Sequence, residues 1–217
     1  MNFIYRLGAF FWPVSKKIQT NNNGKVSVTY YKGNKYLDTK NANYSFGLLH
    51  EVMQFTLDKL EVKQNDHILL LGLGAGSVPK LLQDNYQFNG QLTAVEIDAK
   101  IIEIAQSEFN ISQYTFLKIQ QANAFKFVKN HKQKYHLIII DLFIDVIVPQ
   151  QAYKNDFWMD LRKLLLPKAK IAFNVGIDIS TTEYQSFYTE LEKYFNLKVY
   201  QKVGFFNTIL IAENKEI

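Results

Sequence analysis

The sequence predicts an α/β fold built on a doubly wound, mostly parallel sheet. From residue 66 onward, short apolar runs alternate with segments of helical periodicity, the pattern of strands joined by crossover helices. The run HILLL at residues 67–71 is continuously apolar, as in a strand buried on both faces. Two β-rich runs on either side of Gly204 predict a terminal antiparallel hairpin. We therefore expect one α/β domain over residues 46–217.

The individual elements follow from the same periodicities. Beyond residues 67–71, strands are expected at 91–98, 115–121, 135–143, 170–175, 197–203 and 207–213. Helices are expected at 47–60, 77–83, 99–109, 124–130, 156–166 and 182–194, with Pro167 stopping the helix at 156–166. The carboxyl edge of such a sheet is where open α/β folds bind their ligands.

Residues 1–45 are expected to form an arm and a small β-hairpin. The first 17 residues are rich in aromatic side chains, but Arg6 and Pro13 interrupt them, so a signal peptide is not expected. This arm is expected to pack on the domain or on a second subunit, which makes a homodimer one expectation, and a membrane-surface anchor is less favoured. After the polar stretch TNNNG at residues 20–24, two β-rich runs around Gly33 predict the hairpin.

Composition limits the classes of function. The chain is 47% apolar and has no cysteine, and its four histidines show no ligand spacing, so we expect no disulfide and no metal. The net charge is +5, but the lysines are scattered among acids, which gives no clear nucleic-acid signal. No window reaches the roughly 18 apolar residues of a membrane span. We expect a cytoplasmic protein with a small-molecule acceptor and no membrane partner.

A glycine-rich loop is the strongest functional motif. In LLLGLGAGSVP, Gly72, Gly74 and Gly76 follow a buried strand and precede a helix. Glycines at such a junction allow a sharp turn and close approach of backbone to a ligand, and the helix N-terminus offers free N–H groups. A tight turn that needs glycine for its own sake is the alternative. We expect the three glycines to bind a cofactor.

Polar residues at the ends of the next two strands extend this prediction. Glu96 ends the second strand in VEID, where a carboxylate can accept hydrogen bonds from both ribose hydroxyls, and we include its neighbour Ile97 in the site. Asp98 is expected to cap the following helix. Asn123 and Ala124 end the third strand, where an adenine would lie, although Asn123 suits a helix N-cap equally well.

The motifs favour an adenosyl sulfonium ligand over a dinucleotide. A dinucleotide fingerprint needs its third glycine one position later, where Ser77 stands, and the Gly-Lys-Ser/Thr of a P-loop is absent. The expected ligand is S-adenosylmethionine (SAM), its decarboxylated form or methylthioadenosine.

Two acids follow the fourth strand and are candidates for catalysis. Asp141 stands at the carboxyl edge of the sheet and Asp145 in the next loop. Either could take a proton from an acceptor or face a cation; the alternative is a capping or loop acid, more so for Asp145. Tyr44, Phe143 and Tyr153 are candidates for the acceptor wall or for the core.

These motifs together resemble the spermidine synthase-like branch of the class I SAM-dependent methyltransferases. The resemblance rests on LLLGLGAGSVP, TAVEID, QQANAF and the segment from Asp141 to Leu165, and covers roughly residues 25–213. It implies a Rossmann-like core with a small N-terminal β unit, and a dimer. It places Asp141 where the family's acid activates the attacking amine. The cofactor contacts that it implies are at Gly72, Gly74, Glu96, Asn123 and Ala124.

The sequence also departs from this family. Ala75 and Ser77 occupy the part of the glycine loop where the family carries an Asp, and Asn123 replaces an acid before the adenine slot. The loop after Asp141 lacks the family's Asp-Ser/Thr-rich and Asp-Pro pattern, and Leu49 replaces a tyrosine. A polyamine needs several carboxylates to match its ammonium groups. We therefore expect methyl transfer from SAM, with aminopropyl transfer from decarboxylated SAM and a non-catalytic cofactor-binding protein as alternatives.

Overall fold

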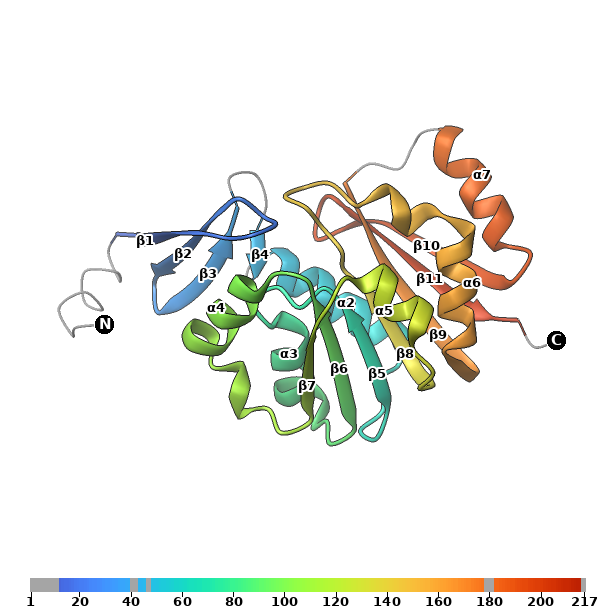
Figure 1. Ribbon diagram of the computed structural model, residues 1–217, viewed down its shortest axis with the longest axis horizontal. Helices are drawn as coiled ribbons and strands as arrows, with labels where there is room; N and C mark the ends of the chain where they lie inside the picture. The colour runs from blue at the N-terminus through green and yellow to red at the C-terminus, as the bar shows by residue number, and fades with distance from the viewer. Residues whose placement is uncertain (1–11, 40–42, 46–47, 178–181, 216–217) are drawn as a thin grey trace.

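The structure, a computed structural model, describes residues 12–39, 43–45, 48–177 and 182–215. Its larger sheet has seven strands in the order β10-β11-β9-β8-β5-β6-β7 (Figure 1). The strands are β5 (His67–Leu71), β6 (Gln91–Glu96), β7 (Leu117–Gln121), β8 (Tyr135–Ile140), β9 (Leu165–Ile177), β10 (Phe195–Val203) and β11 (Asn207–Asn214). Strands β5 to β9 pair in parallel, and β11 runs antiparallel to β9 and β10. The predicted fold class and terminal hairpin are confirmed.

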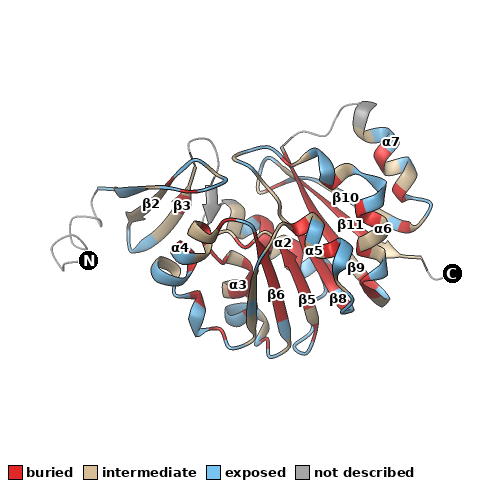
Figure 2. Ribbon diagram, viewed as in Figure 1, coloured by how far each residue is buried: buried red, intermediate tan, exposed pale blue. Residues whose placement is uncertain are grey.

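Helices cover both faces of this sheet. They are α2 (Leu48–Leu60), α3 (Ser77–Tyr86), α4 (Ala99–Phe109), α5 (Ala124–Asn130), α6 (Asn155–Lys163) and α7 (Thr182–Leu191), with short 3-10 turns η1 (Ile111–Gln113) and η2 (Gln150–Tyr153). One core packs α2, α3 and α4 on the sheet, and a second packs α5, α6 and α7 on its other face. The strands between them are buried, while the outer helix surfaces are exposed (Figure 2). Fully buried Trp158 centres the second core, where its indole donates to the Ala152 carbonyl at 2.8 Å.

A second sheet precedes this domain. It is antiparallel, in the order β1 (Val14–Gln19), β2 (Lys25–Tyr31), β3 (Asn34–Asp38) and β4 (Asn43–Ser45). The hairpin of β2 and β3 was predicted, whereas β1 and β4 were not. The sequence of β1, VSKKIQ, lacks apolar alternation, so its strand conformation depends on pairing with β2. The expected arm at residues 1–11 lies outside the described part of the chain.

The small sheet is docked on helix α4. Val26, Val28 and Leu37 are fully buried against Ile101 and Ile104 of that helix. The Tyr30 hydroxyl donates a hydrogen bond to the Glu108 carboxylate, and burial with this bond raises the pKa of Tyr30 to about 12. The small sheet is thereby held beside the carboxyl edge of the large one, where the site lies (Figure 1).

The predicted end of the helix at 156–166 and the predicted start of the next strand at 170 are wrong. Pro167 does not stop a helix: α6 ends at Lys163 and Pro167 lies within β9. Strand β9 pairs with β8 at Leu165 and again from Lys170, with an irregular register between, and its pairing with β11 also involves residues from Lys170 onward. Proline is tolerated in that interval because no ladder hydrogen bond requires its missing N–H.

The described residues contain neither a membrane-spanning helix nor a cluster of metal-ligating side chains. No helix there is both long enough and apolar enough to cross a bilayer. No group of three or more histidine, aspartate or glutamate side chains is arranged to hold a metal ion in the described ranges.

Candidate active site

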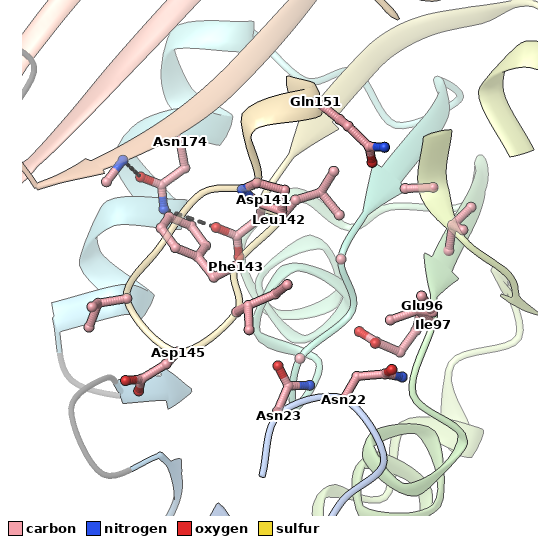
Figure 3. A pocket seen from close by; sticks show the side chains of 18 of the residues that line it. Asn22, Asn23, Glu96, Ile97, Asp141, Leu142, Phe143, Asp145, Gln151 and Asn174 are labelled. Atoms are coloured by element: carbon pink, nitrogen blue, oxygen red, sulfur yellow. Dashed lines mark hydrogen bonds between the residues drawn. The ribbon is translucent and has the colours of Figure 1, made fainter. Parts of the chain in front are cut away.

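A cavity of about 560 Å³ opens at the carboxyl ends of the parallel strands (Figure 3). Its lining comes from the loops after β5, β6, β7 and β8, the end of β9, the β10–β11 turn and the β1–β2 turn, with Leu49 from the start of α2. This is the edge at which open α/β sheets bind ligands. Most of the residues predicted to act in the site line this one cavity, namely Gly72, Gly74, Glu96, Ile97, Asn123, Ala124, Asp141 and Asp145.

The backbone of the glycine loop packs closely against the end of β8. Gly72 has a φ of 95°, and a Cβ atom there would lie 2.1 Å from the carbonyl oxygen of Asp141. The Gly72 N–H donates to the Val95 carbonyl at 2.9 Å, and the Asp141 N–H donates to the Leu71 carbonyl at 2.8 Å. Gly72 and Gly74 line the cavity. Gly76 lies outside its lining, at the start of α3, where a Cβ would meet Ile111 at 2.5 Å.

Glu96 presents a buried carboxylate at one end of the cavity. Its Oε2 accepts the Leu73 N–H at 3.2 Å and its Oε1 accepts the Asp98 N–H at 3.0 Å. Burial raises the pKa of Glu96, while these and neighbouring backbone N–H groups act in the opposite direction. The carboxylate is thus fixed in position, and it retains acceptor capacity for a ligand because it offers about four lone-pair sites.

The β1–β2 turn closes over this end of the cavity. The Asn22 N–H donates to Oδ2 of fully buried Asp98 at 2.8 Å, and Oδ1 of Asp98 accepts the Lys100 N–H at 2.9 Å. Asp98 is therefore the helix cap that the sequence predicted, and it also ties the small sheet to the site. Asn22 and Asn23 line the cavity near Glu96 and Ile97 (Figure 3).

Asn123 caps helix α5 and also lines the cavity. Its Oδ1 accepts the Lys126 N–H at 3.1 Å, which confirms the capping interpretation. Asn123 also lines the cavity beside Ala124, where its side chain can contact an adenine. The two interpretations are compatible because an amide has donor capacity beyond the one accepted bond.

Asp141 is the acid at the centre of the cavity. Its Oδ1 accepts a hydrogen bond from Nδ2 of Asn174 at 2.9 Å, and Oδ1 of Asn174 accepts the Gly176 N–H at 3.2 Å, which fixes the orientation of the amide (Figure 3). Burial raises the pKa of Asp141 to about 6, with a further contribution from the charge of Glu96 and an opposing one from Asn174. Such a carboxyl can exchange a proton near neutral pH.

Asp145 lies at the tip of the loop after β8. Its φ is 56°, and its carboxylate accepts a hydrogen bond from the Thr39 hydroxyl. The neighbouring residues Ile144 and Ile147 exchange both backbone hydrogen bonds, so this loop is a small, tight hairpin. Asp145 thus lines the same cavity as Asp141 but is anchored to the small sheet.

The three aromatic candidates for the acceptor wall have different positions. Phe143 lines the cavity. Tyr153 packs in the core against Phe173 and Phe187, with ring centroids 5.5 and 5.4 Å away. The side chain of Tyr44 lies outside the described part of the structure.

Several lining residues were missed by sequence analysis. Asn174 carried a signal, because it is a single polar residue in the apolar strand KIAFNV. Asn22 and Asn23 were assigned only to a polar break, and Phe206 only to a turn. They reach the site through pairing between segments distant in sequence, which local patterns do not reveal.

The fold and this cavity define a Rossmann-like α/β protein of the class I methyltransferase and spermidine synthase type. A family model described as "Spermine/spermidine synthase domain" matches residues 48–204. The chain belongs to this family.

Individual relatives agree with this assignment. The polyamine aminopropyltransferase of Vibrio vulnificus is 27% identical over 155 residues, which are 68% of this chain and 50% of that protein. Polyamine aminopropyltransferase 2 of Aquifex aeolicus is 31% identical over 160 residues, which are 69% of this chain and 31% of that protein. The chain thus spans half or less of the length of these relatives.

Solved structures show the same fold. A probable spermidine synthase from Corynebacterium glutamicum superposes with a TM-score of 0.65 at 18% identity, covering 95% of this chain and 78% of that one. Human methyltransferase-like protein 13, solved in complex with SAH, gives a TM-score of 0.64 at 22% identity, covering 78% of this chain and 83% of that one.

Proposed function

We propose that the protein transfers an aminopropyl group from decarboxylated SAM to an amine. The observation that carries this proposal is the charge of the cavity. Glu96, Asp141 and Asp145 line it, and none of its described lining residues is a lysine, arginine or histidine. A donor that ends in an ammonium group and lacks a carboxylate suits such a lining, and so does an amine acceptor. The family and the named relatives support the same class of reaction.

The residues of the lining support a position for the nucleoside of the donor. Glu96 would accept from the ribose hydroxyls, and Gly72 and Gly74 would let the nucleoside approach the backbone closely. Ile97 and Ala124 would contact the adenine, and Asn123 would pair with its edge.

Asp141 would act as the base for the acceptor. The lone pair of the neutral amine attacks the propyl carbon bonded to sulfur, a new C–N bond forms, and the C–S bond breaks with its electron pair remaining on sulfur in methylthioadenosine. The amine proton passes to the Asp141 carboxylate and from there to solvent. A carboxyl with a pKa of about 6 is ionised at neutral pH and can accept this proton.

Methyl transfer from SAM, which the sequence favoured, is the second candidate. When Glu96 is assigned to the ribose, Asp145 is the one acid besides Asp141 that remains for the acceptor among the described lining residues. This small number of acids supports methyl transfer. A long polyamine would be matched by more carboxylates.

Calorimetric titration with decarboxylated SAM, SAM and methylthioadenosine distinguishes the candidates. We expect decarboxylated SAM and methylthioadenosine to bind, with affinity reduced about 100-fold or more in Glu96→Ala, because each lost charge-assisted hydrogen bond costs about 1.5–3 kcal/mol. Tighter binding of SAM, with methyl transfer to an amine, would favour the second candidate. A wild-type protein that binds none of the three ligands would contradict both.

A further inference from the structure

Apolar side chains are concentrated at the mouth of the cavity. In the described part of the chain, eight large hydrophobic side chains are exposed, and four of them line this cavity: Ile97, Ile144, Val146 and Phe206. Two more, Ile147 and Phe205, are sequence neighbours of lining residues. Single exposed apolar residues are ordinary, but a cluster around a cavity marks a surface that a ligand covers.

Local structure holds these side chains in place. The Ile144–Ile147 hairpin is closed by hydrogen bonds of 2.9 and 3.1 Å between the two residues' backbones. Phe143 packs against Gly176 of β9, where a Cβ would lie 3.1 Å from the phenyl ring. Phe205 has a φ of 77°, which is rare for a bulky residue and is found where the surrounding structure imposes it. Local structure therefore holds the apolar residues of the loop after β8 and of the β10–β11 turn.

Ile97 lies beside Glu96 at the nucleoside end of the cavity, whereas Phe143 lies next to Asp141 (Figure 3). Val146 and Phe206 line the cavity from the loop after β8 and the β10–β11 turn, and not from the strand ends that would hold the nucleoside. An amine whose nitrogen is at Asp141 would extend its body along these side chains. Contact with them favours an apolar body, because an ammonium placed against these side chains would lose its hydration. Asp145 is the one further carboxylate at this end among the described lining residues that could match a second ammonium.

From this arrangement we infer that the acceptor is a primary amine with an aromatic or branched apolar body, rather than a linear polyamine. This inference rests on the proposed function. Phe206 is its main specificity-determining residue, since it lines the cavity and is 60% exposed, which leaves its ring accessible to an acceptor. Asp145 is the group that would instead favour a second amine, so the acceptors tested include a diamine and a triamine.

The test is release of methylthioadenosine from decarboxylated SAM, with 2-phenylethylamine, isopentylamine, putrescine and spermidine as acceptors. We expect kcat/KM for the two apolar amines to exceed that for the linear amines at least about tenfold, in the range that a few well-matched apolar groups provide. Phe206→Ala should raise KM for 2-phenylethylamine about tenfold, because an apolar contact of this size is removed.

Val199→Ala is the control. Val199 is an apolar residue of β10 that is 44% exposed and does not line the cavity, so this variant should keep the wild-type KM. Transfer to putrescine or spermidine alone, or an unchanged KM in Phe206→Ala, would overturn the inference and leave the proposed function intact. Binding of methylthioadenosine without transfer to any of the four amines would overturn both.

Discussion

The two sides of the cavity are built in different ways. On the donor side, Gly72, Gly74 and Glu96 come from two short motifs, and backbone N–H groups fix the carboxylate. On the acceptor side, Asp141, Asn174 and Phe206 come from three segments far apart in the sequence. The donor side therefore follows from the fold itself. The acceptor side depends on loops whose sequences can change without disturbing the fold.

The largest expected effect is a loss of catalytic rate without a loss of nucleoside affinity. Asp141→Asn should lower the rate of transfer about 10²–10⁴-fold, because the variant lacks a general base, while the affinity for methylthioadenosine stays within a few-fold. Single-turnover kinetics and calorimetry measure the two quantities. Asp145→Asn is the control and should reduce the rate less than about tenfold; an equal loss in both variants would mean that the two acids act as one unit.

The next largest effect tests the close backbone contact between Gly72 and Asp141. Gly72→Ala combines a φ of 95° with a Cβ that would lie 2.1 Å from a backbone oxygen, so it should lower the free energy of unfolding by about 3 kcal/mol or more. Gly33→Ala is matched, because its φ is 80° but nothing lies within 4 Å. Gly33→Ala should cost only about 1–2 kcal/mol. Denaturant unfolding would reveal the difference, and equal values would refute the close approach.

A smaller effect concerns the pH dependence on the acceptor side. Activity should fall as the pH drops through about 6, since protonated Asp141 cannot accept the amine proton. Asn174 donates to the ionised form, so Asn174→Ala should raise the pKa of Asp141 and move the acid limb of kcat/KM upward by roughly half to one pH unit. Asn207→Ala, a lining variant on β11, should leave the limb unchanged; a shift in the opposite direction for Asn174→Ala would contradict the assignment.

The smallest effect probes the apolar contact on the donor side. Ile97→Ala should weaken methylthioadenosine binding about threefold. The effect is small because the bound ligand would cover only part of the Ile97 side chain. Val199 is equally exposed, at 44%, and lies outside the cavity lining. Val199→Ala should therefore bind as the wild type does, and a loss of affinity in both variants would indicate a general change in the fold.

Much of the fold was predictable because each signal was local. The helices at Ala99–Phe109 and Ala124–Asn130 have the predicted bounds, since Asp98 and Asn123 cap them as expected. Pro167 misled the prediction because its tolerance in β9 depends on the register of neighbouring strands. The position of Asp141 at the carboxyl edge of the sheet was predictable from the strand that it follows. Its hydrogen bond with Asn174 was not predictable, because that contact forms only when β8 and β9 pair.

The position of β11 has a consequence for how the chain is made. This strand lies between β9 and β10, although the ribosome synthesises it after both. Until it emerges, β9 has an unpaired edge and β10 lacks its only neighbour in the sheet as described, and exposed strand edges promote aggregation. The nascent protein therefore cannot complete either its sheet or the Phe206 side of its cavity until residue 214 has left the exit tunnel.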